Sequence, residues 1–366
     1  MLKNLDYPPV NQGAVAGEPQ PLSQALTLEG KTLERVQVAR LTAAPPSAEQ
    51  VAADAATGTL TLTPCKTPLF VNGLNPELVE RIKTQLGDKL PYMEILPGLG
   101  SAGSAGANPN RLDLFPGLQP GAAIGAQLVA GDIDLTAIGT LTYIDENQIL
   151  GFGHPFMQAG AVELPLTKAR IVHTMKSIQR SFKMGEATGT VGKIDQDRAA
   201  AISGELGQMP RMIPFHLTVK DTDLGRTRRY DYSVVDYEAI LPFLGLLPPI
   251  QGLTEVMDRQ GPATIRSHFK ILTEELEPVE RTNLFYDQFS GVGFLELAQG
   301  LFLMTTQNIF QDIHLKEVFI DVEVTQNRQT TDIMRAEILP EGEHVHPPTA
   351  PAQTETVEPS EPPIQK

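Results

Sequence analysis

Between Leu118 and His216 this chain consists of short runs of small and β-branched residues that are separated by glycines and polar turns. Residues 125–129 and 135–144 are two such runs, and a polar turn at 145–148 precedes a third run at 149–153. Short runs broken by turn residues are typical of β-hairpins, whereas a helix needs a longer uninterrupted stretch. The pattern therefore favours a β-rich core over a helical bundle.

Composition narrows the possible functions of the 366-residue chain, whose length corresponds to two or three domains. The net charge of −15 argues against nucleic acid or an anionic membrane as the main partner, because both require clustered Lys and Arg. A single cysteine, Cys65, excludes an intramolecular disulfide and a cysteine-based zinc site. No run approaches the roughly 18–20 apolar residues of a membrane span. Residues 1–6 lack a basic start followed by an apolar segment, so the chain is either cytoplasmic or has lost its leader.

One helix and one hairpin are expected before the core. Asn75 is a good N-cap, Pro76 suits the first helical position, and apolar residues at helical spacing predict a helix over 76–86. Gly87 then occupies the position of a C′ glycine. Near the N-terminus, residues 26–28 and 33–38 predict a hairpin around Gly30, and residues 43–57 read as a linker or a short helix.

A second unit of strands and helices is expected after the core. Its segments are a hairpin from residues 212–219 and 228–235, a proline-interrupted helix at 237–257, a strand at 263–272, a helix at 295–309 and a strand at 316–325. Residues 98–110 predict a Gly/Ser/Ala linker, and the Pro/Glu/Thr-rich end of the chain predicts disorder.

The segment Gly151-Phe152-Gly153-His154-Pro155-Phe156 carries the clearest chemical signal. Glycines beside His154 allow a substrate or a second backbone to come close, and a titratable imidazole at the end of a strand can act as a general base. The alternative is that His154 only hydrogen-bonds a turn carbonyl. A serine hydroxyl within about 3.5 Å of a His154 ring nitrogen would favour the enzyme.

The stretch Ala137-Ile138-Gly139-Thr140-Leu141-Thr142-Tyr143, followed by Gly153-His154-Pro155, resembles the SpoIVB-type peptidase domain, a bacterial serine peptidase family of sporulation signalling. Weaker matches continue in order to about residue 215. The resemblance implies a trypsin-like double β-barrel, a Ser-His-Asp mechanism, and alignment of His154 with the catalytic histidine. It also implies a preceding PDZ-like domain, to which residues 118–125 are similar at its end.

The nucleophile of the family does not carry over to this chain. The family places it in a Gly-Met-Ser-Gly-Ser-Pro motif well over a hundred residues after the histidine, and no Gly-x-Ser-Gly-Ser occurs here. Ser290, which precedes a glycine, is the remaining weak candidate, while Ser203 aligns with a structural strand. Asp195 and Asp197 are expected in a turn over 195–198, so no catalytic aspartate is assigned.

These observations predict a mainly β, α+β protein with a trypsin-like double-barrel core and flanking α+β segments. The expected regions are a loosely structured or β region at 1–60, a helix-bearing segment with a linker at 61–110, a peptidase-like domain at 111–215, an α+β unit at 216–335, and a disordered acidic tail at 336–366.

The expected function is that of a non-catalytic, peptide-binding or scaffolding protein of the bacterial cell envelope. The alternative is an active serine endopeptidase with His154 as general base and Ser290 as nucleophile. We expect a protein or peptide partner, no nucleic acid, no transmembrane segment, no cofactor and no metal. The family acts outside the cytoplasm, and its location is expected here by analogy.

Overall fold

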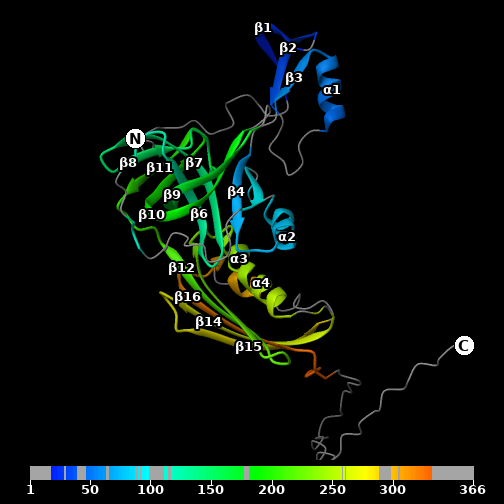
Figure 1. The fold of residues 1–366 in the computed structure, drawn as a ribbon, viewed down its shortest axis with the longest axis vertical. Helices are drawn as coiled ribbons and strands as arrows, with labels where there is room; N and C mark the ends of the chain where they lie inside the picture. Colours follow the sequence, from blue (N-terminus) through cyan, green and yellow to red (C-terminus); the bar gives the residue numbers. More distant parts are fainter. Residues whose placement is uncertain are drawn as a thin grey trace, which may run out of the picture. The chain divides into compact units, whose positions relative to one another are not determined.

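The computed structural model is mostly strand, and its helices are short (Figure 1). It describes residues 18–28, 30–38, 47–62, 66–87, 90, 92–98, 111–113, 117–176, 181–257, 259, 261–287, 298–303 and 306–331. The prediction of a β-rich fold is confirmed. The chain divides into a unit of residues 1–329 and a unit of residues 330–366, and every element named below belongs to the first.

A small three-stranded sheet forms near the N-terminus from β1 (Gln20–Leu28), β2 (Lys31–Val38) and β3 (Thr59–Leu62). The expected hairpin is present, and Gly30 takes the positive φ of +76° that its turn requires. Helix α1 (Ala48–Ala56) precedes β3, and the hydroxyl of its N-cap Ser47 accepts a hydrogen bond from the backbone N–H of Gln50 at 3.2 Å. Of the two alternatives for residues 43–57, the structure has a helix over 48–56, and residues 43–46 lie outside the described part of the chain.

Strands β4 (Thr67–Asn72) and β5 (Met93–Pro97) are parallel, and helix α2 (Pro76–Leu86) connects them. The predicted helix over 76–86 is confirmed. The Asn75 side chain accepts a hydrogen bond from the Leu78 N–H at 2.9 Å, as expected for an N-cap.

The predicted role of Gly87 was wrong. It has right-handed helical angles (φ −54°, ψ −40°), and its N–H still donates to the Lys83 carbonyl at 3.0 Å. The Leu90 N–H likewise donates to the Leu86 carbonyl at 2.8 Å. Because the helical hydrogen bonds continue past Leu86, no left-handed residue is needed at 87.

Six antiparallel strands close into a ring, which we call the barrel. Its strands are β6 (Ala123–Gly131), β7 (Asp134–Asp145), β8 (Gln148–Gly151), β9 (Gly160–Met175), β10 (Phe182–Arg198) and β11 (Ala201–Leu206). They follow the order β6-β9-β10-β11-β8-β7, and pairing of β6 with β7 completes the ring. The expected strands of this region are therefore confirmed, and residues 167–175 are strand rather than helix.

The expected turn at 195–198 was wrong. Strand β10 continues to Arg198, and the turn lies at residues 199–200. Both acidic side chains are satisfied within the strand, because Asp195 accepts a hydrogen bond from the Ser203 hydroxyl at 3.2 Å and Asp197 accepts backbone N–H groups. Polar residues that usually indicate a turn thus belong to the body of the barrel.

The remaining strands extend the same sheet beyond the barrel, and we call them the open strands. In spatial order they are β15 (Val279–Asp287), β14 (Ala263–Thr273), β16 (Leu315–Thr325), β12 (Met212–Asp221) and β13 (Arg226–Val235). Helices α3 (Leu241–Leu244) and α4 (Leu247–Val256) follow β13, and α4 contacts β12 and β13. Residues 298–303 are also helical.

The expected strands and the proline-interrupted helix of this second unit are present, with prolines in the first turn of α3 and of α4. Of the helix expected at 295–309, the described residues 298–303 and 306 are helical and residues 307–309 are not. Strand β15 was not predicted. Within the described residues no helix has both the length and the apolar character needed to cross a lipid bilayer.

The barrel and the open strands share one sheet and one hydrophobic core. Strand β13 pairs with β6 through Tyr232 and Gly131, and Phe215 on β12 stacks on Tyr232 with ring centroids 5.1 Å apart. The expected division between residues 215 and 216 falls inside β12. In the described part of the chain the sheet closes once, at the barrel, while the open strands end at β15. The trypsin-like double barrel and the division into domains stay predictions.

Candidate functional site

The loop from Gly151 to Gly160 connects β8 with β9, and its backbone is strained. Phe152 has φ +70° and Gln158 has φ +60°, backbone angles that residues other than glycine seldom adopt. Gly153, between Phe152 and His154, has φ +76°. The Phe152 ring lies against Gly139 of β7 so closely that a Cβ there would overlap it. Such strain persists only where the surroundings hold it, and it is common at functional sites.

The hydrogen bonds of His154 define its tautomer. Its Nδ1 lies 2.9 Å from the Pro155 carbonyl oxygen and 3.4 Å from the Thr67 hydroxyl oxygen. A carbonyl can only accept, so Nδ1 carries the proton and Nε2 keeps its lone pair in the neutral ring. Because Nδ1 donates, the Thr67 hydroxyl does not pass its proton to this nitrogen. Thr67 is thus a neighbour of the imidazole rather than an activated nucleophile.

An open cavity of about 280 Å³ lies beside His154. It is formed by the start of β4, the middle of β7, the loop after β8 and the start of β10. Its lining residues are Lys66, Thr67, Pro68, Ile138, Gly139, Thr140, Phe152, His154, Ser181, Phe182 and Lys183. The cavity combines an imidazole, hydroxyl groups, two lysines and aromatic rings, which suits it to a ligand with both polar and apolar parts.

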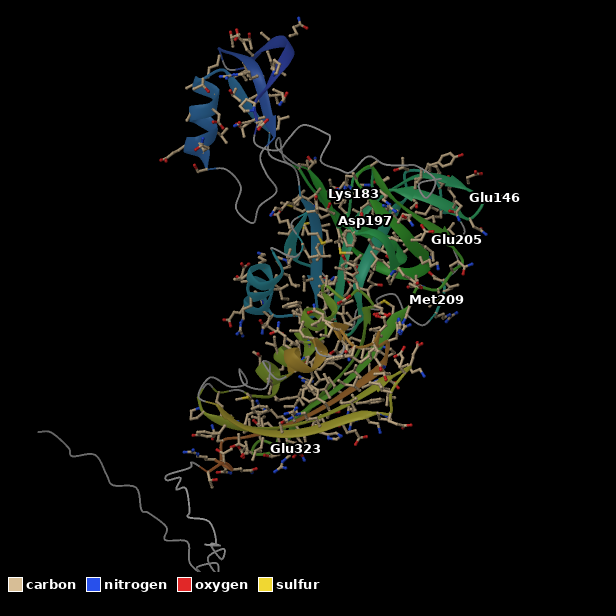
Figure 2. The ribbon with its side chains drawn as sticks, turned by 180° about the vertical axis from the view of Figure 1, so that it is seen from behind. Glu146, Lys183, Asp197, Glu205, Met209 and Glu323 are labelled. Atoms are coloured by element: carbon tan, nitrogen blue, oxygen red, sulfur yellow. The ribbon has the colours of Figure 1, made fainter. Side chains whose placement is uncertain are left out.

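Lys183 lies at the start of β10, and Asp197 lies near the other end of the same strand. Figure 2 shows both residues on the barrel. The Lys183 ammonium donates to the Thr140 hydroxyl of β7 at 3.0 Å. This bond joins two of the strands that line the cavity. It holds the lysine head at the cavity, with its remaining N–H groups available for a ligand.

Asp197 holds the loop that carries His154. Its carboxylate is buried, with one oxygen 2.8 Å from the Phe156 N–H and the other 2.6 Å from the Met157 N–H and 3.3 Å from the Ala159 N–H. Burial raises the pKa of Asp197, and the backbone N–H donors partly oppose that rise. Three backbone donors on one carboxylate fix residues 156–159, and thereby the position of His154 at the start of the loop.

A second buried carboxylate, Asp134, lies at the start of β7. It accepts hydrogen bonds from the Thr136 hydroxyl at 3.0 Å, from the Asn72 amide at 3.3 Å, and from the Gln127 amide through a short contact. Burial raises the pKa of Asp134 to about 6 although these bonds act in the opposite direction. The group joins β4, β6 and β7, and so supports the frame of the barrel rather than the cavity.

The sequence-predicted site residues are only partly brought together. His154 lines the cavity, whereas Ser290 lies outside the described residues, so its placement is not tested. Ser203 is in β11, where its hydroxyl donates to Asp195. In the part of the chain that is described, His154 bonds to the Pro155 carbonyl and the Thr67 hydroxyl, and no serine hydroxyl lies within hydrogen-bond distance of its ring.

Sequence reasoning missed Thr67, Lys183 and Asp197. Thr67 is 87 residues from His154 in the chain, and only the pairing of β4 with β7 brings it near the loop. No local pattern indicates this contact. A signal did exist for Asp197, since a carboxylate in a strand needs donors, but its polar neighbours favoured a turn.

Metal-ligating side chains do not gather in groups of three or more within the described ranges. Family models, curated proteins and solved structures were each compared with this chain, and none of them matches it.

Proposed function

We propose that this chain is a non-catalytic peptide-binding protein whose binding site is the His154 cavity. The observation that carries the proposal is the pairing of His154 with a carbonyl and a threonine hydroxyl beside an open, mixed polar and apolar cavity. An acyl-transfer enzyme needs a nucleophile next to its base, because the two act as a unit. A binding protein needs only the held loop, the cavity and its polar groups.

The proposal includes the family suggested by the sequence. The Gly139-Thr140-Leu141-Thr142 stretch lies in β7 and His154 follows β8, so the residues that carry the resemblance to SpoIVB-type peptidases lie together on a closed antiparallel barrel. This arrangement supports a peptidase-like barrel that has lost its serine. A place in the bacterial cell envelope, a trypsin-like ancestry and a protein or peptide partner belong to the same proposal.

A second candidate, the serine endopeptidase, is favoured by one observation. The Nδ1–H tautomer leaves the His154 Nε2 lone pair available, as a general base requires, and Asp197 keeps the loop in place. Ser290 would then have to supply the nucleophile.

Labelling with a fluorophosphonate probe separates the two functions. The binding protein should remain unlabelled, whereas labelling that is lost in Ser290→Ala and His154→Ala would establish the enzyme and overturn the proposal. A labelled protein whose signal survives both substitutions would contradict the enzyme as well, since its chemistry would lie at another residue.

Peptide binding is tested directly on arrays of random hexapeptides probed with the purified chain. We expect captured sequences whose signal falls at least tenfold in His154→Ala. The matched control is His268→Ala, because His268 bonds Thr282 on the open strands, remote in sequence from the cavity. Absence of any captured peptide, or equal loss in both variants, would overturn the proposed function.

A further inference from the structure

The lining of the His154 cavity contains no aspartate or glutamate, in a chain with 44 acidic and 29 basic residues. Its charged side chains are Lys66 and Lys183. The other polar side chains of the lining are His154 and the hydroxyl-bearing Thr67, Thr140 and Ser181. A concave site lined by one sign of charge concentrates the opposite charge. The cavity therefore differs from the acidic chain around it, and its electrostatics favour an anion.

Lys183 provides one of the two lysine charges in the lining. Its hydrogen-bond acceptor is the neutral hydroxyl of Thr140 at 3.0 Å, and among the described residues its ammonium forms no ion pair. Glu186, the nearest carboxylate along β10, is instead bonded to Arg170 of β9. An ammonium has three N–H groups, so Lys183 can keep Thr140 and still donate to an anionic oxygen.

His154 supplies a second donor when an anion is present. Its Nδ1–H is directed to the Pro155 carbonyl, and its Nε2 has no hydrogen-bond partner within the described residues. An imidazole that carries a proton on both nitrogens can donate from Nε2 to an anion while Nδ1–H keeps the carbonyl.

The apolar part of the cavity restricts the kind of anion. Phe152, Phe182, Ile138 and Pro68 line it together with the lysines. The volume of about 280 Å³ is just below the usual range of ligand pockets, so it suits the end of a peptide better than a long segment. A carboxylate and an apolar side chain on one residue occur together at a peptide C-terminus.

Resting on the proposed peptide-binding function, we infer that the cavity holds the free C-terminal carboxylate of a peptide whose last residue is apolar. The carboxylate binds the Lys183 ammonium and the His154 imidazole, and the last side chain packs against the Phe152 and Phe182 rings. The shared chemistry is that of a carboxylate, which a small free acid could also supply.

The experiment compares peptides in two chemical forms. Hexapeptides captured from the arrays are resynthesised with an N-terminal dye, once with a free carboxylate and once with a C-terminal amide, and binding is measured by fluorescence anisotropy. We expect the amide to bind at least tenfold more weakly, because it lacks the charge that meets Lys183. Lys183→Met should weaken the free acid about tenfold and the amide less than threefold.

The matched control is Lys220→Met, since Lys220 is an exposed lysine of β12 that pairs with Glu323. It should bind both forms as the wild-type protein does. Equal affinity for acid and amide, or equal loss of both in Lys183→Met, would overturn the inference while leaving peptide binding intact. Absence of peptide binding in either form would instead overturn the proposed function.

Acetate and inorganic phosphate are the probes for a free small anion. We expect either to displace the labelled acid only at millimolar concentrations, as an isolated charge contact without the apolar side chain should. Displacement at the concentration of the peptide itself would assign the site to small anions and overturn the peptide source.

Discussion

The barrel and the open strands bury their carboxylates in different ways. In the open strands, fully buried Asp221 pairs with Arg259 at 2.7 Å, and Arg259 also reaches Asp223 at 3.0 Å. Hydrogen bonds from Gln326 and Thr325 lower the pKa of Asp223. In the barrel, Asp134 and Asp197 are held by neutral amide, hydroxyl and backbone N–H donors, and burial raises the pKa of each.

This difference indicates what each region is suited to do. The Arg259 guanidinium supplies the charge that compensates the buried Asp221 carboxylate and also pairs with Asp223. A buried carboxylate held only by neutral donors has a raised pKa, as Asp197 does, and the pKa of Asp134 rises to about 6. We therefore expect removal of the Arg259 cation to cost the most stability in the open strands, and the stability of the barrel to depend on pH through Asp134.

Arg259→Met should have the largest effect on stability. The substitution leaves the Asp221 carboxylate buried and without its cation, which costs about 3–5 kcal/mol of unfolding free energy. Urea denaturation at pH 7 measures the loss. The control Arg228→Met removes an exposed arginine that pairs with Glu255 at 3.3 Å and should cost at most about 1 kcal/mol. Equal losses in the two variants would contradict the role of Arg259 as the cation of a buried carboxylate.

Asp134→Asn should reveal the pH sensitivity of the barrel. The folded protein holds the Asp134 proton more tightly than the unfolded chain does. The protonated Asp134 therefore stabilises the folded protein fully below the ordinary pKa of 3.8, and this stabilisation is lost as the pH rises through about 6. A rise of this size corresponds to roughly 3 kcal/mol.

The measurement is urea denaturation of both proteins between pH 3 and 7. As the pH increases, the unfolding free energy of the wild-type protein should fall by roughly 3 kcal/mol relative to that of the variant. Other titrating groups are common to both and cancel in the difference. A difference that is constant with pH, or that changes in the opposite direction, would show that burial does not raise this pKa.

Asp197→Asn tests how the His154 loop is held. The amide keeps one acceptor but replaces the other with a donor that faces a backbone N–H, so we expect a loss of about 2 kcal/mol. Hydrogen exchange at Met157 and Ala159 should accelerate far more than exchange in the open strands. Asp195→Asn, two residues earlier on β10, is the control and should leave exchange in the loop unchanged. Unaltered exchange at Met157 in Asp197→Asn would remove the carboxylate from its positioning role.

Thr67→Val should have the smallest effect. The 3.4 Å contact with His154 is long, and Nδ1 keeps the Pro155 carbonyl, so unfolding free energy should fall by less than about 1 kcal/mol. The ¹⁵N chemical shifts of the imidazole should continue to report protonated Nδ1 and unprotonated Nε2 in the neutral ring. A switch to the other tautomer would mean that Thr67, rather than Pro155, determines which nitrogen carries the proton.

Local patterns predicted those parts of the fold that depend on neighbouring residues. Asn75 and Pro76 located α2, and alternating residues located β12 and β13. Gly87 was placed in the wrong conformation because the continuing bonds of Leu90 are not visible in composition. Closure of the barrel depends on pairing between β6 and β7 and between β6 and β9, which no short motif encodes.

The site was predicted only at its most conspicuous residue. His154 stands out between a glycine and a proline, whereas Lys183 and Thr67 reach the cavity from strands far away in the chain. Asp197 was mistaken for a turn residue because Asp195-Gln196-Asp197-Arg198 has the composition of a turn. Tertiary burial, rather than local propensity, determines its role.

Mass spectrometry of a bound peptide tests the central claim, that the His154 cavity binds peptides without cleaving them. A hexapeptide selected on the arrays is incubated with the full chain at pH 7 for a day and then analysed. We predict that the peptide is recovered intact, although its binding depends on His154. Cleavage products that appear with the wild-type protein and are absent with His154→Ala would contradict the account and establish a peptidase.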